Sequence, residues 1–110
     1  MPLSERVRVE VFIPGLPDPV YDLLLEELGD ELSYAFGGCT VAPAFGKYRS
    51  SSGVILPDKV NVLFTDAPFR WEEDRRIIER YAREIQDAVE QALEKEESIL
   101  IAVHPVFHFE

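Results

Sequence analysis

The clearest pattern along the chain is the strict alternation of apolar and other side chains over residues 7–13. Valine or isoleucine occupies every second position of this stretch, and the positions between them include Arg8 and Glu10. A period of two residues predicts a β-strand with one buried side and one open side. The Pro-Gly-Leu-Pro segment at 14–17 ends this strand.

Two longer stretches repeat apolar side chains every three or four residues, which is the period of an amphipathic helix. The first follows Asp18 and Pro19, an N-cap residue and a proline suited to the first helical position, and it ends at Gly37-Gly38. The second has an apolar stripe from Ile77 to Leu93, and we expect it to begin at the Asp66-Ala67-Pro68 turn. Both stretches predict helices that bury one side.

Three further segments have strand character. Residues 39–45 predict an edge strand, because Pro43 has no amide hydrogen to donate to a neighbour. Residues 59–65 predict an interior strand, with 54–56 as an extension. Residues 99–103 predict a last strand that Pro105 interrupts, followed by a tail or a short continuation.

The order of these segments is β-α-β-β-α-β. This order is typical of the ferredoxin-like fold, an α+β two-layer sandwich. The right-handed crossover rule favours an antiparallel sheet with strand order 4-1-3-2 and both helices on one face. At 110 residues, we expect a single domain that spans positions 1–110.

Two helices can cover only one face of such a sheet, so the other face stays open. On the predicted strands this open face carries an apolar patch of Phe12, Leu63, Leu100 and Ala102, with His104 beside it. Exposed apolar patches mark surfaces of association or ligand binding, and symmetric homo-oligomers are common. We therefore expect a homodimer or a higher homo-oligomer. The alternative is a monomer with a few exposed apolar residues.

The chain is acidic, with 21 Asp and Glu against 11 Lys and Arg, and a formal net charge of -10. Such a surface repels phosphate backbones and anionic lipids, so we expect neither nucleic acid nor a membrane as a partner. One cysteine cannot form an internal disulfide, and residues 1–6 lack the apolar run of a signal peptide. These features predict a cytoplasmic protein.

A basic spot interrupts this acidity within a predicted polar loop over residues 46–53. Lys47 and Arg49 flank Tyr48 there. Exposed loops often carry binding residues, so these three side chains are candidates for contacting a protein partner, an anionic small molecule or the acidic second helix of another subunit. An ordinary flexible hairpin loop is the alternative.

Candidate catalytic and metal-binding residues do not form a convincing group. Cys39 and His104 lie on opposite edge strands, about 14 Å apart at the usual strand spacing. His104 and His108 are four residues apart on one strand, about 13 Å, which is too far to share one metal ion. The alternative is that His108 and Glu110 are partial ligands of a site completed by another subunit. Asp18 and Asp66 are explained as helix N-caps. We expect no metal or cofactor, and the chain has no Gly-rich nucleotide-binding motif.

One enzymatic alternative arises at the N-terminus. Removal of Met1 would expose the amine of Pro2, and the chain resembles the tautomerase superfamily in this Met-Pro start and in its repeated βαβ pattern. That resemblance implies an N-terminal proline acting as a base. Four residues, 3–6, separate Pro2 from the predicted strand, and we expect them to leave the amine on a mobile end.

Parts of the middle of the chain resemble a group of small bacterial proteins, some of them cyanobacterial, that share a domain of unknown function. The resembling stretches are Gly37–Val41, Gly46–Arg49, Gly53 and Asp58–Val62. The resemblance implies a ferredoxin-like fold and no particular activity.

These observations favour a non-enzymatic binding or regulatory module that self-associates through its open sheet face. The competing hypothesis is a small enzyme, with a site near Asp66 or between subunits.

Overall fold

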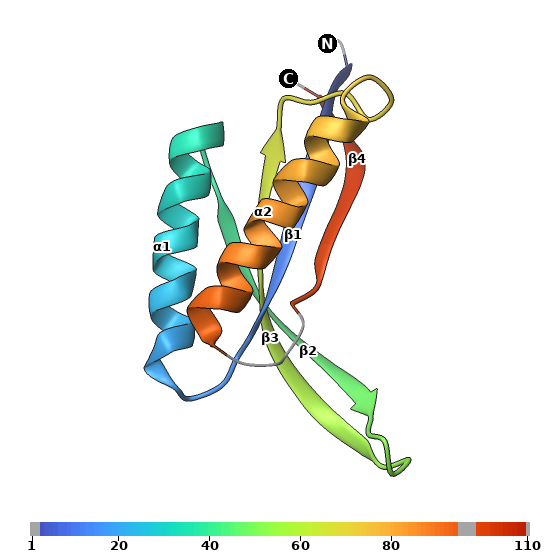
Figure 1. Ribbon diagram of the computed structural model, residues 1–110. Helices are drawn as coiled ribbons and strands as arrows, with labels where there is room; N and C mark the ends of the chain where they lie inside the picture. The colour runs from blue at the N-terminus through green and yellow to red at the C-terminus, as the bar shows by residue number, and fades with distance from the viewer. Residues whose placement is uncertain (1–2, 95–98, 110) are drawn as a thin grey trace.

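The computed structural model describes residues 3–94 and 99–109, which form a four-stranded sheet and two helices (Figure 1). Both helices lie on the same face of the sheet, as Figure 1 shows. The elements in chain order are β1 (Leu3–Pro14), α1 (Pro19–Phe36), β2 (Thr40–Arg49), β3 (Ile55–Ala67), α2 (Arg75–Leu93) and β4 (Ile101–Phe109).

The strand order is β2-β3-β1-β4, which is the predicted order 4-1-3-2 read from the other side. Every neighbouring pair is antiparallel. The architecture is therefore a ferredoxin-like α/β sandwich, as the order of the sequence patterns predicted.

The core lies between the helices and the sheet. Alternate β1 residues, from Val7 to Ile13, are at most 1% exposed and face the helices. Tyr21, Leu24, Leu28 and Leu32 approach them from α1, and Ile78, Ile85, Val89 and Leu93 come from α2. The two helical stripes thus meet the buried side of the alternating strand, which is the packing that fixes the fold.

The first helix follows its sequence signals closely. The Asp18 carboxylate accepts a hydrogen bond of 3.0 Å from the Val20 amide, so Asp18 is the predicted N-cap. Gly37 ends the helix with a φ of 87°, in the left-handed region that glycine enters without steric cost. None of the helices in the described ranges is long and apolar enough to cross a membrane.

The second helix begins later than predicted. Asp66 and Ala67 still belong to β3, and α2 starts at Arg75 after a turn in which Asp74 occupies the cap position. The prediction that Asp66 caps this helix is therefore wrong. Strand pairing continues to Ala67 because Val7, opposite it, is still part of β1.

The face assignment of β3 was also wrong for Leu63. Leu63 pairs with Val11, and residues opposite each other in an antiparallel pair point to the same side, so Leu63 lies in the core at 0% exposure. Val60, Val62, Phe64 and Asp66 occupy the open face instead.

The first and last strands of the chain are longer than predicted. Residues 3–6 belong to β1 and pair with β4, which continues through Pro105 to Phe109. Pro105 is tolerated because β4 is an edge strand. The Phe12 amide donates to the Leu100 carbonyl, so even-numbered β4 residues bond to β1 and Pro105 directs its missing donor outward.

The segment predicted as a polar loop over residues 46–53 is mostly a paired hairpin. β2 and β3 remain in register from Gly46 opposite Asp58 to Arg49 opposite Ile55, and the turn spans only 50–54. This hairpin, which we call the arm (residues 45–59), extends beyond the helical layer (Figure 1).

Candidate functional site

The open face has an apolar centre. The strand register places Phe12 opposite Val62. Leu100 accepts a hydrogen bond from the Phe12 amide and Ala102 pairs with Glu10, so both lie on the same side of the sheet as Phe12. Phe64 and the small side chains of Ala42 and Ala44 extend this centre toward β2. Leu100 is 61% exposed and the others are partly buried, although most face apolar neighbours across the strands. The interface role of Phe12, Leu100, Ala102 and His104 remains a prediction.

Beyond this centre, toward the chain termini, the open face carries a cross-strand ion pair. Arg8 lies opposite Asp66 and donates two hydrogen bonds to its carboxylate, Nε to Oδ1 at 2.7 Å and a terminal nitrogen to Oδ2 at 3.0 Å. The guanidinium also lies 4.5 Å from the centre of the Phe64 ring. A planar, bidentate pair of this kind fixes both side chains better than a single contact does.

Two histidines of β4 join this polar end. The Nε2 atom of His108 lies 2.7 Å from Asp66 Oδ2, and that of His104 lies 3.1 Å from Glu10 Oε1. The Asp66 carboxylate thus contacts side chains from both β1 and β4. We call Arg8, Glu10, Asp66, His104 and His108 the polar cluster.

The cluster holds Asp66 in its charged form. The hydrogen bond from Arg8 lowers the pKa of Asp66, partial burial opposes this effect, and the contact with His108 lowers the pKa further. The same hydrogen bond raises the pKa of Arg8. A carboxylate with a lowered pKa is a poor proton acceptor near neutral pH, which disfavours Asp66 as a general base.

The acidic charge of the chain avoids the open face. Within β1 and β3, that face carries Arg6 and Arg8 against Glu10, Asp58 and Asp66, which leaves a formal charge of only -1. The helix α1 carries five acidic residues and no basic one: Asp22, Glu26, Glu27, Asp30 and Glu31. Two copies can therefore approach through their sheets with less repulsion than through α1.

Both edges of the sheet resist extension by another strand. β2 and β4 are the edge strands, and they contain Pro43 and Pro105 in their interiors. A proline removes one backbone donor from an exposed edge and so blocks pairing with a further chain. These edges therefore favour association of two copies through the open sheet face over association by strand pairing.

A crevice lies at the root of the arm. Its volume is about 720 Å³, and its walls come from the β1–α1 loop and both strands of the arm. Gly15 approaches the arm closely and donates a 2.8 Å hydrogen bond to the Lys59 carbonyl. Tyr48, Asp58 and Lys59 supply polar groups to the crevice, and Phe45 supplies an aromatic ring.

The predicted binding residues of the arm do not share one side. Lys47 and Arg49 point to the helix side of the hairpin, while Tyr48, opposite Leu56, points to the open-face side. Only Tyr48 of the three lines the crevice. Their role in binding remains a prediction.

The remaining sequence candidates lie apart from one another. Cys39 is half-buried at the start of β2, where burial raises the pKa of its thiol, and it is separated by two strands from β4. Across residues 3–94 and 99–109, the histidine, cysteine and acidic side chains form no group of three suited to a metal ion. Glu110 and Pro2 lie outside the described residues. The argument that residues 3–6 separate Pro2 from the strand was wrong, because β1 begins at Leu3.

The polar cluster was not predicted from the sequence, although the alternation within β3 contained one signal of it. Asp58 and Asp66 share the alternation of Val60, Val62 and Phe64, whereas Leu63 alternates with Asn61, Thr65 and Ala67. Carboxylates at both ends of one set mark that set as the open side. The pairing of Arg8 with Asp66 depends on strand register, which the sequence alone did not define.

Comparison with known proteins supports the fold. No protein-family model matches the chain, and no curated protein matches it. Among solved structures, the chain is similar to CPII from Thiomonas intermedia K12, whose structure was determined with ADP, AMP and acetate bound. The sequences are 14% identical over 100% of this chain and 94% of that chain, with a TM-score of 0.57. The resemblance to a particular bacterial family remains a prediction.

Proposed function

We propose that this chain is a small-ligand-binding regulatory module that assembles into a homo-oligomer through its open sheet face. The observation that carries this proposal is the apolar centre of that face around Phe12, Val62 and Phe64. The face is nearly neutral in an acidic chain, and prolines interrupt both sheet edges. A face of this kind favours burial against a second copy.

The arm-root crevice is the ligand site in this proposal. Asp58 and Lys59 supply opposite charges to its lining, Tyr48 supplies a hydroxyl, and Phe45 offers an aromatic surface. This combination suits a ligand that carries a hydrogen-bond donor, a ring and an anionic group. Adenine nucleotides have all three, and CPII, which shares the fold, was solved with ADP and AMP bound.

The assembly is tested by sedimentation velocity of the wild type and of Phe12→Glu. At high salt we expect an oligomer for the wild type and a monomer for the variant, because a carboxylate would be buried without a partner. Phe109→Glu is the matched control, since Phe109 is exposed on the other side of the sheet. An unchanged sedimentation coefficient for Phe12→Glu would rule out this interface.

Ligand binding is tested by isothermal titration with ADP, AMP and acetate separately. We expect heat of binding for at least one of them, and at least about tenfold weaker binding for Lys59→Ala, since Lys59 supplies the positive charge of the crevice. Arg76→Ala removes an exposed cation of α2 and serves as the control. Absence of binding by all three compounds would refute the ligand class.

A further inference from the structure

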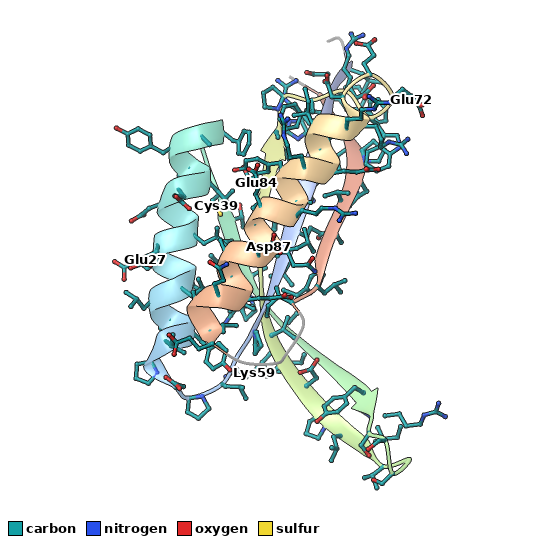
Figure 2. The ribbon with its side chains drawn as sticks, viewed as in Figure 1. Glu27, Cys39, Lys59, Glu72, Glu84 and Asp87 are labelled. Atoms are coloured by element: carbon teal, nitrogen blue, oxygen red, sulfur yellow. The ribbon has the colours of Figure 1, made fainter. Side chains whose placement is uncertain are left out.

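A groove of about 310 Å³ separates the two helices on the outer side of the molecule. Its lining includes the exposed Ala35 and Ala88, the buried Leu32 and Ile85, and the partly buried Tyr81. Glu31 of α1 and Glu84 of α2 line opposite walls. Figure 2 shows Glu84 on the side of α2 that faces α1.

The two carboxylates act on the same part of the groove. Burial raises the pKa of Tyr81, and the charges of Glu31 and Glu84 raise it further. Neither glutamate forms an ion pair with any residue in the described ranges. The groove therefore combines an apolar surface with two negative charges that lack a cationic partner.

The helix-side face of the arm has the opposite character. Strand register places Phe45, Lys47 and Arg49 of β2 on this face, opposite Lys59, Pro57 and Ile55 of β3. The face contains three cations and no acidic residue. Phe45 is 79% exposed and Ile55 is 59% exposed.

The cations near the tip of the arm also lack partners. Neither Lys47 nor Arg49 forms an ion pair within 3–94 and 99–109. They lie two residues apart on one strand, about 7 Å, with the Phe45 ring a further two residues along. A two-stranded hairpin with apolar residues exposed on both sides is only marginally stable by itself, so contact with another surface would stabilise it.

We propose that the helix-side face of the arm of one copy docks into the inter-helix groove of a second copy. Phe45 contacts the apolar surface of the groove, and Lys47 and Arg49 face Glu31 and Glu84. The arm leads away from its own helices beyond the end of the helical layer (Figure 1), so its own groove is out of reach. The contact uses the helical layer and is independent of the open face.

This contact is heterologous, because the arm of one copy meets a different surface of the next. Contacts of that type close into rings or extend into chains, and their electrostatic part weakens with salt. We therefore expect a self-association that increases at low ionic strength, in addition to any assembly through the open face.

A charge swap tests the pairing. The arm variant Lys47→Glu/Arg49→Glu and the groove variant Glu31→Lys/Glu84→Lys are measured separately and as an equimolar mixture, by sedimentation equilibrium at low and high salt. We expect each variant alone to lose the salt-sensitive association by about tenfold or more, because opposite charges become like charges. The mixture should recover it, since arms of one variant then meet complementary grooves of the other.

The control is Arg76→Glu/Arg83→Glu, which changes the net charge as the arm variant does but lies outside the groove lining. It should associate as the wild type does. Failure of the mixture to recover association, equal loss in the control, or a wild type without salt-sensitive association would each overturn the proposal.

The same series is repeated in the Phe12→Glu background, so that the two contacts are read separately. With Phe12 in place, variants that lose only the arm contact should keep the salt-insensitive oligomer formed by the open face. In the Phe12→Glu background that oligomer should be absent, and the mixture of arm and groove variants should still recover the salt-sensitive association.

Discussion

The two faces of this sheet are built from the same alternating strands, but different interactions stabilise them. Over residues 7–13 of β1, the helix side carries only valine and isoleucine and is sealed from solvent, whereas the open side carries Arg8, Glu10 and Phe12. On the helix side, apolar shape alone determines the packing. On the open side, Arg8 and Glu10 have cross-strand partners, Asp66 and His104, that the register supplies.

Because of this difference, stability should depend on side-chain volume on the helix side and on hydrogen-bond and ion-pair partners on the open side. Among the described residues, no buried side-chain nitrogen or oxygen lacks a hydrogen-bond partner. The polar cluster is therefore a satisfied network placed next to an apolar surface. Changes to neighbouring residues of one strand can separate the two kinds of sensitivity.

The largest difference is expected between Leu63→Ala and Val62→Ala, adjacent positions on opposite sides of β3. Leu63 is completely buried, so its truncation leaves a cavity and should lower the free energy of unfolding by about 3 kcal/mol. Val62 is partly exposed, so its truncation to alanine should lower the free energy of unfolding by about 1 kcal/mol or less. Urea unfolding followed by circular dichroism measures both values.

The Val62→Ala variant also tests the open face. If Val62 is buried in an oligomer, its truncation should cost more at high protein concentration than at low concentration. The cost of Leu63→Ala should not vary in this way. Equal costs for the two variants would contradict the assignment of Leu63 to the core and Val62 to the open side.

The next largest effect is expected from Asp66→Asn. The substitution removes a charge-assisted bidentate pair and should lower the free energy of unfolding by about 1.5 kcal/mol at neutral pH. The pKa of Asp66 is lowered in the folded state, so its contribution is complete above the ordinary aspartate pKa of about 3.9. The contribution is lost as the pH falls through the lowered folded-state pKa.

Urea unfolding of both proteins at several pH values between neutral and acid checks this behaviour. The wild type should be more stable than Asp66→Asn at neutral pH, and the curves should converge in acid. Asp22→Asn, on the exposed side of α1, provides a control without a comparable pair. A difference that stayed constant into acid would show that the carboxylate charge is not responsible.

The sequence predicted the fold because its strongest patterns lie in the core. The two-residue period of β1 indicates only a strand, and the apolar stripe of α1 with its capping residues indicates only a helix. The order of the elements then limits the possible topologies. β3 was harder, since both of its sides contain apolar residues. There Leu63 was placed on the wrong face, and Asp66 was explained by a helix that begins only at Arg75.

The candidate sites were less predictable for a physical reason. The polar cluster is made by residues from three strands, and a shift of one residue in register would separate Arg8 from Asp66. Similarly, the segment that starts at Gly46 has the composition of a loop, and its serines at 50–52 do lie in the turn, yet residues 46–49 pair with β3. Long-range pairing, which local composition does not report, decided both cases.

The smallest effect is expected at the root of the arm, where both sides of the sheet become open. A Cβ atom at Gly15 would lie 3.0 Å from Lys59 Cγ and 3.1 Å from the Lys59 carbonyl oxygen, which is a tight contact with backbone. Gly15→Ala should therefore cost about 1 kcal/mol through overpacking, partly offset by about 0.5 kcal/mol from a less flexible unfolded chain. Gly46→Ala, which meets no atom within 4 Å, should have no such steric cost.

Global stability is a weak readout for so small a change, so hydrogen exchange of the arm amides provides the sharper one. Gly15 anchors the arm through its 2.8 Å bond to the Lys59 carbonyl, and a displaced Lys59 should raise exchange in residues 45–59 while the core strands keep their protection. Equal exchange of the arm in Gly15→Ala, Gly46→Ala and the wild type would mean that the hairpin is held by its own ladder. In that case the close approach at Gly15 would shape the crevice without stabilising the arm.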